Sequence, residues 1–546
     1  MATNKLDGAM YASMVAAGAS NLHEHVEEVN DLNVFPIPDG DTGENMMLTM
    51  QGGAQAAGDE EDLSKTSAAV ARGMLLGARG NSGVILSQFF AGLAEGFQTF
   101  GTADVHALEQ AVESGVGCAF EAVVTPTEGT ILTVLRDACD YARKCQCGCI
   151  EDYFEAFIGE AKRSLAHTPD LLPVLKEAGV VDSGGAGLIY IIEGMYAALC
   201  GKAPSDVRYQ VSQKTQSVNP DLFGPDSVME FGYCTELLLR LQNAKTDVET
   251  FDVGIVTEYL QSIGDSVVTV KTDSIVKLHV HTMTPYKVLE FCQRYGEFLT
   301  VKIENMMLQH NETEANAKAV SANTERRKFG IVTVAMGEGI CNSFCEMGAD
   351  EVIVGGQTMN PSAEDFLSAF DCVNADTIFV LPNNGNVLLA ARQAAKIYVG
   401  SDIRVIPTRT VGDGFAVLSM LDLESGDADE IEAGMNEAMQ DVITVEVSKS
   451  IRDAELGGVK VQKGDYIGIQ GKTVLCAGQD RETVAKECIK ALQLSTHALA
   501  LVIRGKDTSS EEADRVAAMV KQQYPMVEIC QTDGEQEIYD YILVAE

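Results

Sequence analysis

The chain has no tryptophan, no long apolar run and only half as many basic as acidic residues. Among its 546 residues, 40 are lysine or arginine and 80 are aspartate or glutamate, so the formal net charge is −40. This acidic excess argues against a broad surface for nucleic acid or for anionic membranes. Because no stretch of about 18 apolar residues occurs, we expect no membrane span and no integral membrane contact. The composition is otherwise ordinary for a globular protein.

Paired cysteines at the spacing of a zinc finger are also missing. The 14 cysteines are spread along the chain, and many lie in apolar helical contexts, which is typical of reduced thiols in a cytoplasmic protein. The alternating Cys145, Cys147 and Cys149 lack a partnering Cys/His pair, so a metal site is the weaker interpretation there. The first thirty residues carry acidic residues early and predict an amphipathic helix, not a signal peptide. We therefore expect a cytoplasmic protein.

The length predicts about three or four domains. Residues 1–204 show helical periodicity almost throughout and predict an all-helical domain. A polar linker separates them from residues 226–310, where strand-like runs alternate with helices and predict a small α/β domain. After a second polar linker, residues 328–546 contain short apolar strands and helices in alternation, as in a parallel α/β sheet.

The most informative segment is Asn33–Met46, which reads NVFPIPDGDTGENM. Pro36 and Pro38 stiffen it, because proline fixes its own φ and restricts the residue before it. A loop so constrained can turn the carboxylates of Asp39 and Asp41 toward one point. Converging oxygen ligands of this kind suit Mg²⁺, which keeps several waters and shares its other positions with substrate phosphates. The alternative is a surface turn rich in Asp and Asn.

Three further segments place glycines and hydroxyl groups at predicted helix starts: Gly77–Gly83, Pro126–Leu132 and Val181–Gly187. Glycines allow backbone N–H groups to approach an anion, and a helix N-terminus adds favourable potential. We expect Gly77–Gly83 to hold phosphates ahead of a helix that begins near Val84, with Arg79 supplying positive charge. No Gly-Lys-Ser/Thr follows, so this is not a Walker loop. Tight helix connections, an N-cap and helix packing remain the alternatives.

Together these segments resemble the nucleotide-binding subunit of dihydroxyacetone kinases and, more closely, the kinase subunit of bacterial fatty acid kinases. The resemblance runs essentially end to end and includes Gly232–Glu236, Lys277–Thr282, Gly355–Ser362 and Leu381–Asn384. It implies an amino-terminal helical barrel that binds ATP and Mg²⁺, a middle α/β domain, and a carboxy-terminal α/β domain similar to DegV-type fatty-acid-binding proteins. The role of Gly355–Ser362 stays open between a remnant pocket, a docking surface, a dimer contact and a plain turn.

The resemblance also implies roles for individual residues. Asp39 and Asp41 match the catalytic metal aspartates, Asn33 is a further candidate for Mg²⁺, and we expect Arg79 to stabilise the transferring group. Glu44 departs from the threonine that the resemblance leads us to expect. The residues implied to bind the nucleotide are Asn33, Thr42, Gly43, Asn45, Met46, Gly80, Asn81, Ser82, Gly83, Thr130, Asp182, Gly184, Gly185 and Ala186.

A second metal is predicted in the middle domain. Alternate residues of a strand share one side, so His279 and His281 present two imidazoles together. With Cys234 they form a set suited to Zn²⁺, and the resemblance implies such a site. His310 and Glu236 are weaker candidates for a fourth ligand. As bare histidines on an apolar strand they would otherwise be core or surface residues.

We expect an ATP-dependent kinase that phosphorylates the carboxylate of a fatty acid held by a separate DegV-type protein, which gives acyl phosphate for phospholipid synthesis. A carboxylate acceptor is already ionised, so positioning and charge neutralisation suffice. The alternatives are a dihydroxyacetone-type kinase and a regulatory module that binds nucleotide without turnover. We also expect a homodimer, although no motif supports that expectation.

Overall fold

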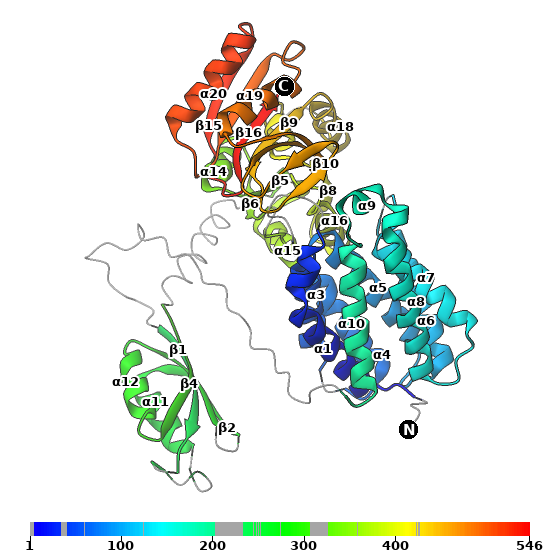
Figure 1. Ribbon diagram of the computed structural model, residues 1–546. Coiled ribbons are helices and arrows are strands. Elements are labelled where there is room, and N and C mark those ends of the chain that lie inside the picture. Colours follow the sequence, from blue (N-terminus) through cyan, green and yellow to red (C-terminus); the bar gives the residue numbers. More distant parts are fainter. Residues whose placement is uncertain are drawn as a thin grey trace. The chain divides into compact units, whose positions relative to one another are not determined.

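The computed structural model in Figure 1 describes residues 5–33, 41–58, 60–123, 125–202, 233–243, 245–246, 248, 251, 253–272, 275–305, 326–356, 359–421, 423 and 426–546. The chain divides into two compact units, of which the first comprises Met1–Tyr209 with Arg326–Glu546 and the second Gln210–Glu325. The predicted fold class is confirmed, because the amino-terminal region is helical and the remaining regions combine helices with sheets.

The amino-terminal region of the first unit is built from helices alone within its described residues. They are α1 (Gly8–Glu24), α2 (Val26–Asp31), α3 (Thr42–Ala56), α4 (Leu63–Gly77), α5 (Gly80–Phe97), α6 (Val105–Glu121), α7 (Ile131–Lys144), α8 (Ile150–Leu171), α9 (Pro173–Ala178) and α10 (Ser183–Leu199). Aspartates cap several of these helices, as when Asp7 accepts a hydrogen bond from the Met10 N–H at 2.8 Å. One continuous apolar core joins the helices and includes the fully buried Phe89 and Phe90.

Neighbouring helices approach closely where small residues face each other. Helices α3 and α4 lie side by side, and a Cβ atom added to Gly73 of α4 would lie 2.3 Å from the Gly52 carbonyl oxygen of α3. Such a contact leaves no room for a side chain. The periodic small residues that predicted these helices therefore also set the distance between them.

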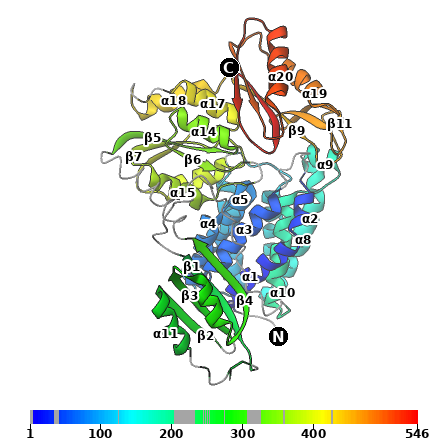
Figure 2. The same cartoon turned by 90° about the vertical axis from the view of Figure 1, so that its left-hand side faces the viewer.

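The second unit, which Figure 2 shows in green, is a four-stranded antiparallel sheet with two described helices. Its elements are β1 (Tyr233–Leu241), α11 (Gly254–Ile263), β2 (Asp265–Thr272), β3 (Ile275–Thr282), α12 (Pro285–Cys292) and β4 (Gly296–Asn305), and the strand order is β2-β3-β1-β4. Alternate residues such as Leu237, Leu239 and Leu278 are buried, which places the core on one face of the sheet.

The carboxy-terminal region of the first unit begins with a parallel sheet, as the sequence predicts. Its elements are β5 (Arg327–Ala335), α14 (Glu338–Glu346), β6 (Glu351–Val354), α15 (Ala363–Cys372), β7 (Ala375–Leu381), α16 (Leu388–Ile397) and β8 (Asp402–Val405), followed by α17 (Val411–Ser419) and α18 (Ala428–Ala438). The strand order β6-β5-β7-β8 changes direction at β5, which is where ligand crevices form in such sheets.

A second sheet follows, and it is mixed rather than parallel. Its elements are β9 (Ile443–Lys449), β12 (Tyr466–Gln470), β13 (Thr473–Gly478), α19 (Arg481–Ala491), β14 (Leu499–Arg504), α20 (Ser510–Gln523), β15 (Glu528–Asp533) and β16 (Tyr539–Ala545), with a small hairpin of β10 (Ala454–Leu456) and β11 (Val459–Val461). Among its described strands, only β14 and β15 pair in parallel. The strands between residues 443 and 478 were missed in the sequence, because short hairpin strands lack the strand–helix alternation that marks a parallel sheet.

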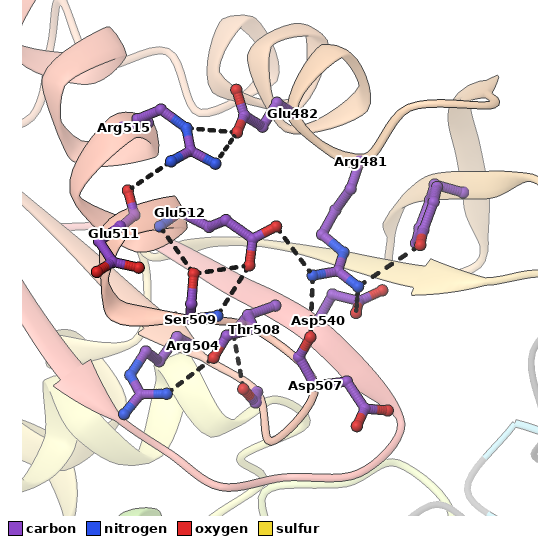
Figure 3. Close-up of polar contacts among 12 residues, drawn as sticks. Arg481, Glu482, Arg504, Asp507, Thr508, Ser509, Glu511, Glu512, Arg515 and Asp540 are labelled. Atoms are coloured by element: carbon purple, nitrogen blue, oxygen red, sulfur yellow. Dashed lines mark hydrogen bonds and ion pairs between the residues drawn. The ribbon is translucent and has the colours of Figure 1, made fainter.

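Arg481 holds the helices of this second sheet against its strands, as Figure 3 shows. Its guanidinium lies 3.1 Å from the Asp540 carboxylate and 3.6 Å from that of Glu512, and it donates to the Asp507 carbonyl oxygen at 3.1 Å. Burial raises the pKa of Asp540 to about 6, although Arg481 opposes this shift. The pair is mostly buried, so the arginine joins α19, α20 and β16 in one place.

Among the described helices, none combines the length and the apolar character that crossing a membrane requires.

The close packing of α3 and α4 predicts unequal effects of two identical substitutions. Gly73→Ala forces a methyl group onto backbone atoms and should lower the free energy of unfolding by about 1–3 kcal/mol. Gly117→Ala in α6 adds a methyl group where no atom lies within 4 Å and should be neutral or stabilise by up to about 1 kcal/mol. Urea denaturation followed by circular dichroism measures both, and equal losses would contradict the packing argument.

Candidate functional site

Helices α3 and α10 begin side by side, held by one asparagine. The Oδ1 atom of Asn33 accepts hydrogen bonds from the hydroxyls of Thr42 and Ser183, each at 3.1 Å. Thr42 is the first residue of α3 and Ser183 the first of α10. A neighbouring asparagine, Asn30, accepts a 2.7 Å hydrogen bond from the Gly43 N–H. Two of the predicted segments thus meet at their helix starts.

The start of α7 joins the same end through Asp182. This N-cap carboxylate accepts hydrogen bonds from the backbone N–H of Gly185, at 2.7 Å, and from that of Ile131, the first residue of α7. Burial raises the pKa of Asp182 to about 6, and the two N–H groups only partly offset that shift. The carboxylate therefore serves two helix starts at once.

Helix α5 completes the group, and it begins earlier than the sequence predicts. It starts at Gly80 rather than near Val84, so most of the expected phosphate loop forms the first turn of a helix. Gly80 has a φ of +57°, and a Cβ atom there would lie 2.6 Å from Nδ2 of the buried Asn45 in α3. Only glycine fits this contact, which sets the start of α5 against α3.

The starts of α3, α5, α7 and α10 therefore lie together, as the four segments predict. Each helix start presents backbone N–H groups and the positive end of a helix dipole. Several such ends attract an anion, and in a chain of net charge −40 they supply local positive potential. This end of the helical region is suited to phosphate groups.

Of the two predicted metal aspartates, the structure describes only Asp41. Asp39 lies outside the described residues. Asp41 is the N-cap residue of α3, and its carboxylate accepts a hydrogen bond from Nδ2 of Asn360, which follows strand β6 in the carboxy-terminal region. Glu44, the unexpected acid, is exposed in the first turn of α3, where a carboxylate is favourable.

Arg79 also faces the carboxy-terminal region. Its Nη1 atom donates to the Asn360 carbonyl oxygen at 2.9 Å, and Nη2 lies 3.6 Å from the Asp365 carboxylate. The arginine is the N-cap residue of α5 and is mostly buried. It thus lies at the grouped helix starts, but its described partners are in another part of the fold.

The remaining predicted nucleotide residues lie at or near the starts of these helices and differ in burial. Met46, Gly83, Gly184, Gly185 and Ala186 are buried where helices pack, and a Cβ atom on Gly185 would lie 3.0 Å from Val134. Thr130, Asn81 and Ser82 are only partly buried. The Thr130 hydroxyl donates to the Thr127 carbonyl oxygen at 2.8 Å, and Asn81 Nδ2 donates to Asn386 Oδ1 at 3.1 Å.

Three parts of the chain match known protein families. Residues 36–197 match the DAK2 domain, residues 230–313 the middle domain of FakA-like fatty acid kinase proteins, and residues 330–546 the C-terminal domain of the same proteins. Protein YloV of Bacillus subtilis is 40% identical over 565 residues, and the match covers 100% of each chain. The chain belongs to the FakA-like family of fatty acid kinase proteins.

Two solved structures align with parts of the chain. The Streptococcus pneumoniae Fatty Acid Kinase B3 protein loaded with linoleic acid is 11% identical, and the alignment covers 40% of this chain and 99% of that one with a TM-score of 0.31. The dihydroxyacetone kinase from C. freundii in complex with AMP-PNP and Mg²⁺ is 19% identical, with 34% of this chain and 33% of that one covered and a TM-score of 0.28. The family assignment rests on the sequence matches.

In this FakA-like protein, the structure describes only the backbone of the candidate zinc ligands Cys234, His279 and His281. The register of β1 and β3 pairs Cys234 with His281 and Glu236 with His279. The side chains of these four residues, and all of His310, lie outside what the structure describes. The zinc site stays a prediction that this register favours, since directly paired residues of adjacent strands are neighbours.

Three residues at the site were missed in the sequence. Ser183 lies in the predicted segment Val181–Gly187, so its place at the start of α10 was open to prediction. Asn360 lies in Gly355–Ser362, a segment already noted but given no role. Arg452, whose Nη1 donates to the carbonyl oxygens of Asn33 and, at 3.2 Å, Asp31, gave no signal, because it is 421 residues from Asp31.

The raised pKa of Asp182 predicts a pH-dependent stability. Because the folded pKa of about 6 exceeds the ordinary value of 3.8, protonation favours the folded state, and this stabilisation is lost as the pH rises through about 6. Relative to Asp182→Asn, the wild-type Tm should fall by about one or two degrees between about pH 5.3 and about pH 8, because only roughly 1 kcal/mol of the stabilisation remains at pH 5.3. Calorimetry in this range stays above the pI of 4.5. Asp140→Asn, at an exposed site, should track the wild type at every pH.

The register in the middle domain predicts bound zinc. Purified protein should contain about one zinc per chain, and Cys234→Ser or His279→Ala should remove most of it, because each substitution deletes a predicted ligand. Plasma mass spectrometry measures the content. His167→Ala, an exposed histidine in α8, is the matched control and should leave the zinc in place. Zinc that persists in both ligand variants would refute the site.

Proposed function

We propose that this protein is an ATP-dependent kinase that phosphorylates the carboxylate of a fatty acid held by a separate DegV-type binding protein, giving acyl phosphate for phospholipid synthesis. The observation that supports it best is the grouping of four helix starts beside Asp41 and Arg79. Membership of the FakA-like family agrees with this proposal.

The donor atoms at the grouped helix starts fit Mg²⁺. Three oxygen atoms lie near one another there: those of the Asp41 carboxylate, of the Thr42 hydroxyl, and Oδ1 of Asn33, which contacts Thr42. Mg²⁺ prefers hard oxygen ligands of this kind. Asp41 and Asn33 would hold the ion together with Asp39. Bound there, Mg²⁺ neutralises phosphate charge.

The chain's own residues supply positioning and charge. The helix starts bind phosphate oxygens through backbone N–H groups, and the Arg79 guanidinium stabilises charge on the transferring phosphoryl group. A fatty carboxylate is ionised near neutral pH, so no group has to remove a proton from it. A carboxylate oxygen forms a bond to the γ-phosphorus while the bond from that phosphorus to the bridging oxygen breaks, and ADP leaves with both electrons of that bond.

The proposal predicts that Asp41→Ala lowers turnover by about 100-fold or more, because it removes a carboxylate that aligns the triphosphate. The assay measures acyl phosphate formed from Mg-ATP and a linoleate-loaded DegV-type protein. Asp140→Ala, an exposed aspartate of α7, is the matched control and should keep wild-type turnover. Circular dichroism spectra of the two variants should coincide.

The same assay separates the alternatives. Retained turnover in Asp41→Ala would eliminate this site. Phosphorylation of dihydroxyacetone in place of the fatty acid would identify a dihydroxyacetone-type kinase. Binding of Mg-ATP with neither product formed would identify a regulatory module.

A further inference from the structure

One residue of the carboxy-terminal region contacts both charged groups of the proposed kinase site. Nδ2 of Asn360 donates a hydrogen bond to the Asp41 carboxylate, and the Asn360 carbonyl oxygen accepts one from Nη1 of Arg79 at 2.9 Å. An ionised carboxylate accepts hydrogen bonds and donates none, so the nitrogen of the amide must be the atom that faces Asp41. The side chain therefore holds the carboxylate while the backbone of the same residue holds the cation.

The chain turns tightly on the amino-terminal side of Asn360. The Gly356 N–H donates to the Met359 carbonyl oxygen at 3.1 Å, and a Cβ atom on Gly355 would lie 2.6 Å from Cγ of Pro361. Pro361 also restricts the residue before it, which is Asn360, to extended backbone conformations. Both neighbours of Asn360 are thus fixed, and its own backbone has little freedom to move.

The start of α15 fixes the other side of this segment and reaches Arg79 as well. Ser362 and Asp365 form a capping box, in which the Ser362 hydroxyl accepts from the Asp365 N–H at 3.2 Å and the Asp365 carboxylate accepts from the Ser362 N–H at 2.8 Å. The same carboxylate lies 3.6 Å from Nη2 of Arg79. The guanidinium is therefore held through two of its nitrogen atoms, and because arginine carries five N–H donors, others remain for phosphate oxygens.

The Asn360 amide is buried at the grouped helix starts. The residue is 2% exposed, and a Cβ atom on Gly80 at the start of α5 would lie 3.7 Å from its Nδ2 atom. Its Oδ1 atom has no hydrogen-bond partner among the described residues. A buried amide oxygen without a protein partner costs free energy, and such atoms call for an explanation beyond stability. Water bound to Mg²⁺ is a donor, so this acceptor suits a metal site beside Asp41.

We propose that Asn360 is a positioning residue of the kinase site, so that the carboxy-terminal region completes a site whose other proposed residues all lie in the helical region. The inference rests on the proposed function, in which Asp41 holds Mg²⁺ and Arg79 stabilises the transferring group. The Asn360 amide orients the carboxylate, and its carbonyl sets the place of the guanidinium relative to that carboxylate. This gives Gly355–Ser362 a role in the site.

Asn360→Ala tests the side chain alone, because the backbone carbonyl that holds Arg79 stays. Calorimetric titration of the full chain with Mg²⁺ and AMP-PNP, an ATP analogue, measures binding without turnover. The Kd should rise about tenfold or more, the usual effect of losing a hydrogen-bonded partner of a metal ligand. With EDTA in place of Mg²⁺, the variant should bind the analogue as the wild type does. A merely structural role would weaken binding equally in both conditions.

A matched control removes a buried side chain from the same contact between the two regions. Gln393 is 5% exposed, and its described hydrogen bonds are to the Leu75 carbonyl oxygen, at 2.6 Å, and to Gln88. Gln393→Ala should therefore leave the Kd for Mg-AMP-PNP unchanged. Circular dichroism spectra of both variants should coincide with that of the wild type.

A double variant shows whether Asn360 acts through Asp41. In the Asp41→Ala background, Asn360→Ala should change the Kd for Mg-AMP-PNP by less than about twofold, because the group that it positions is gone. Additive losses would overturn the inference, as would an unchanged Kd in Asn360→Ala, equal losses with Mg²⁺ and with EDTA, or an equal loss in Gln393→Ala. A Mg²⁺-dependent loss in a protein that forms no acyl phosphate would overturn the proposed function and leave the positioning role in place, so the two failures are distinguishable.

Discussion

The site depends on two side chains that each serve two helices. Asn33 accepts from the first residues of α3 and α10, and Asp182 accepts from the starts of α10 and α7. Without them, four positive helix ends would lie together with fewer negative or polar groups to offset their repulsion. The apolar core orients the helices, but these acceptors bring their ends to one place.

That grouping reconciles a strongly acidic chain with the anionic ligand that we propose for it. Overall charge acts at long range and is screened by salt, whereas N–H groups at a helix start act at contact distance. Asp182 adds a carboxyl group among these ends, but it accepts hydrogen bonds from two backbone N–H groups and burial favours its neutral form. The local potential can therefore differ in sign from that of the whole protein.

Sequence reasoning predicted the parts of the fold that repeat locally. Helix periodicity marked α4 to α7 and α10, because side chains three or four apart on a helix share one face. Apolar runs marked β5 to β8, because both faces of a buried parallel strand are covered. It placed the start of α5 too late, since the φ of +57° at Gly80 and the contact with Asn45 depend on another helix. It could not find the partner of Asp41, because Asn360 is 319 residues away and only the folded chain brings them together.

The order of the units along the chain has a consequence for synthesis. The helical region leaves the ribosome first, whereas Asn360 and Arg452, which contact it in the folded chain, follow after the whole second unit has been made. At about 5–20 residues per second, roughly 10 to 50 seconds pass between the end of the helical region and Arg452. During that interval the helical region has none of these contacts, so a nascent chain must hold its four grouped helix starts together with residues of that region alone.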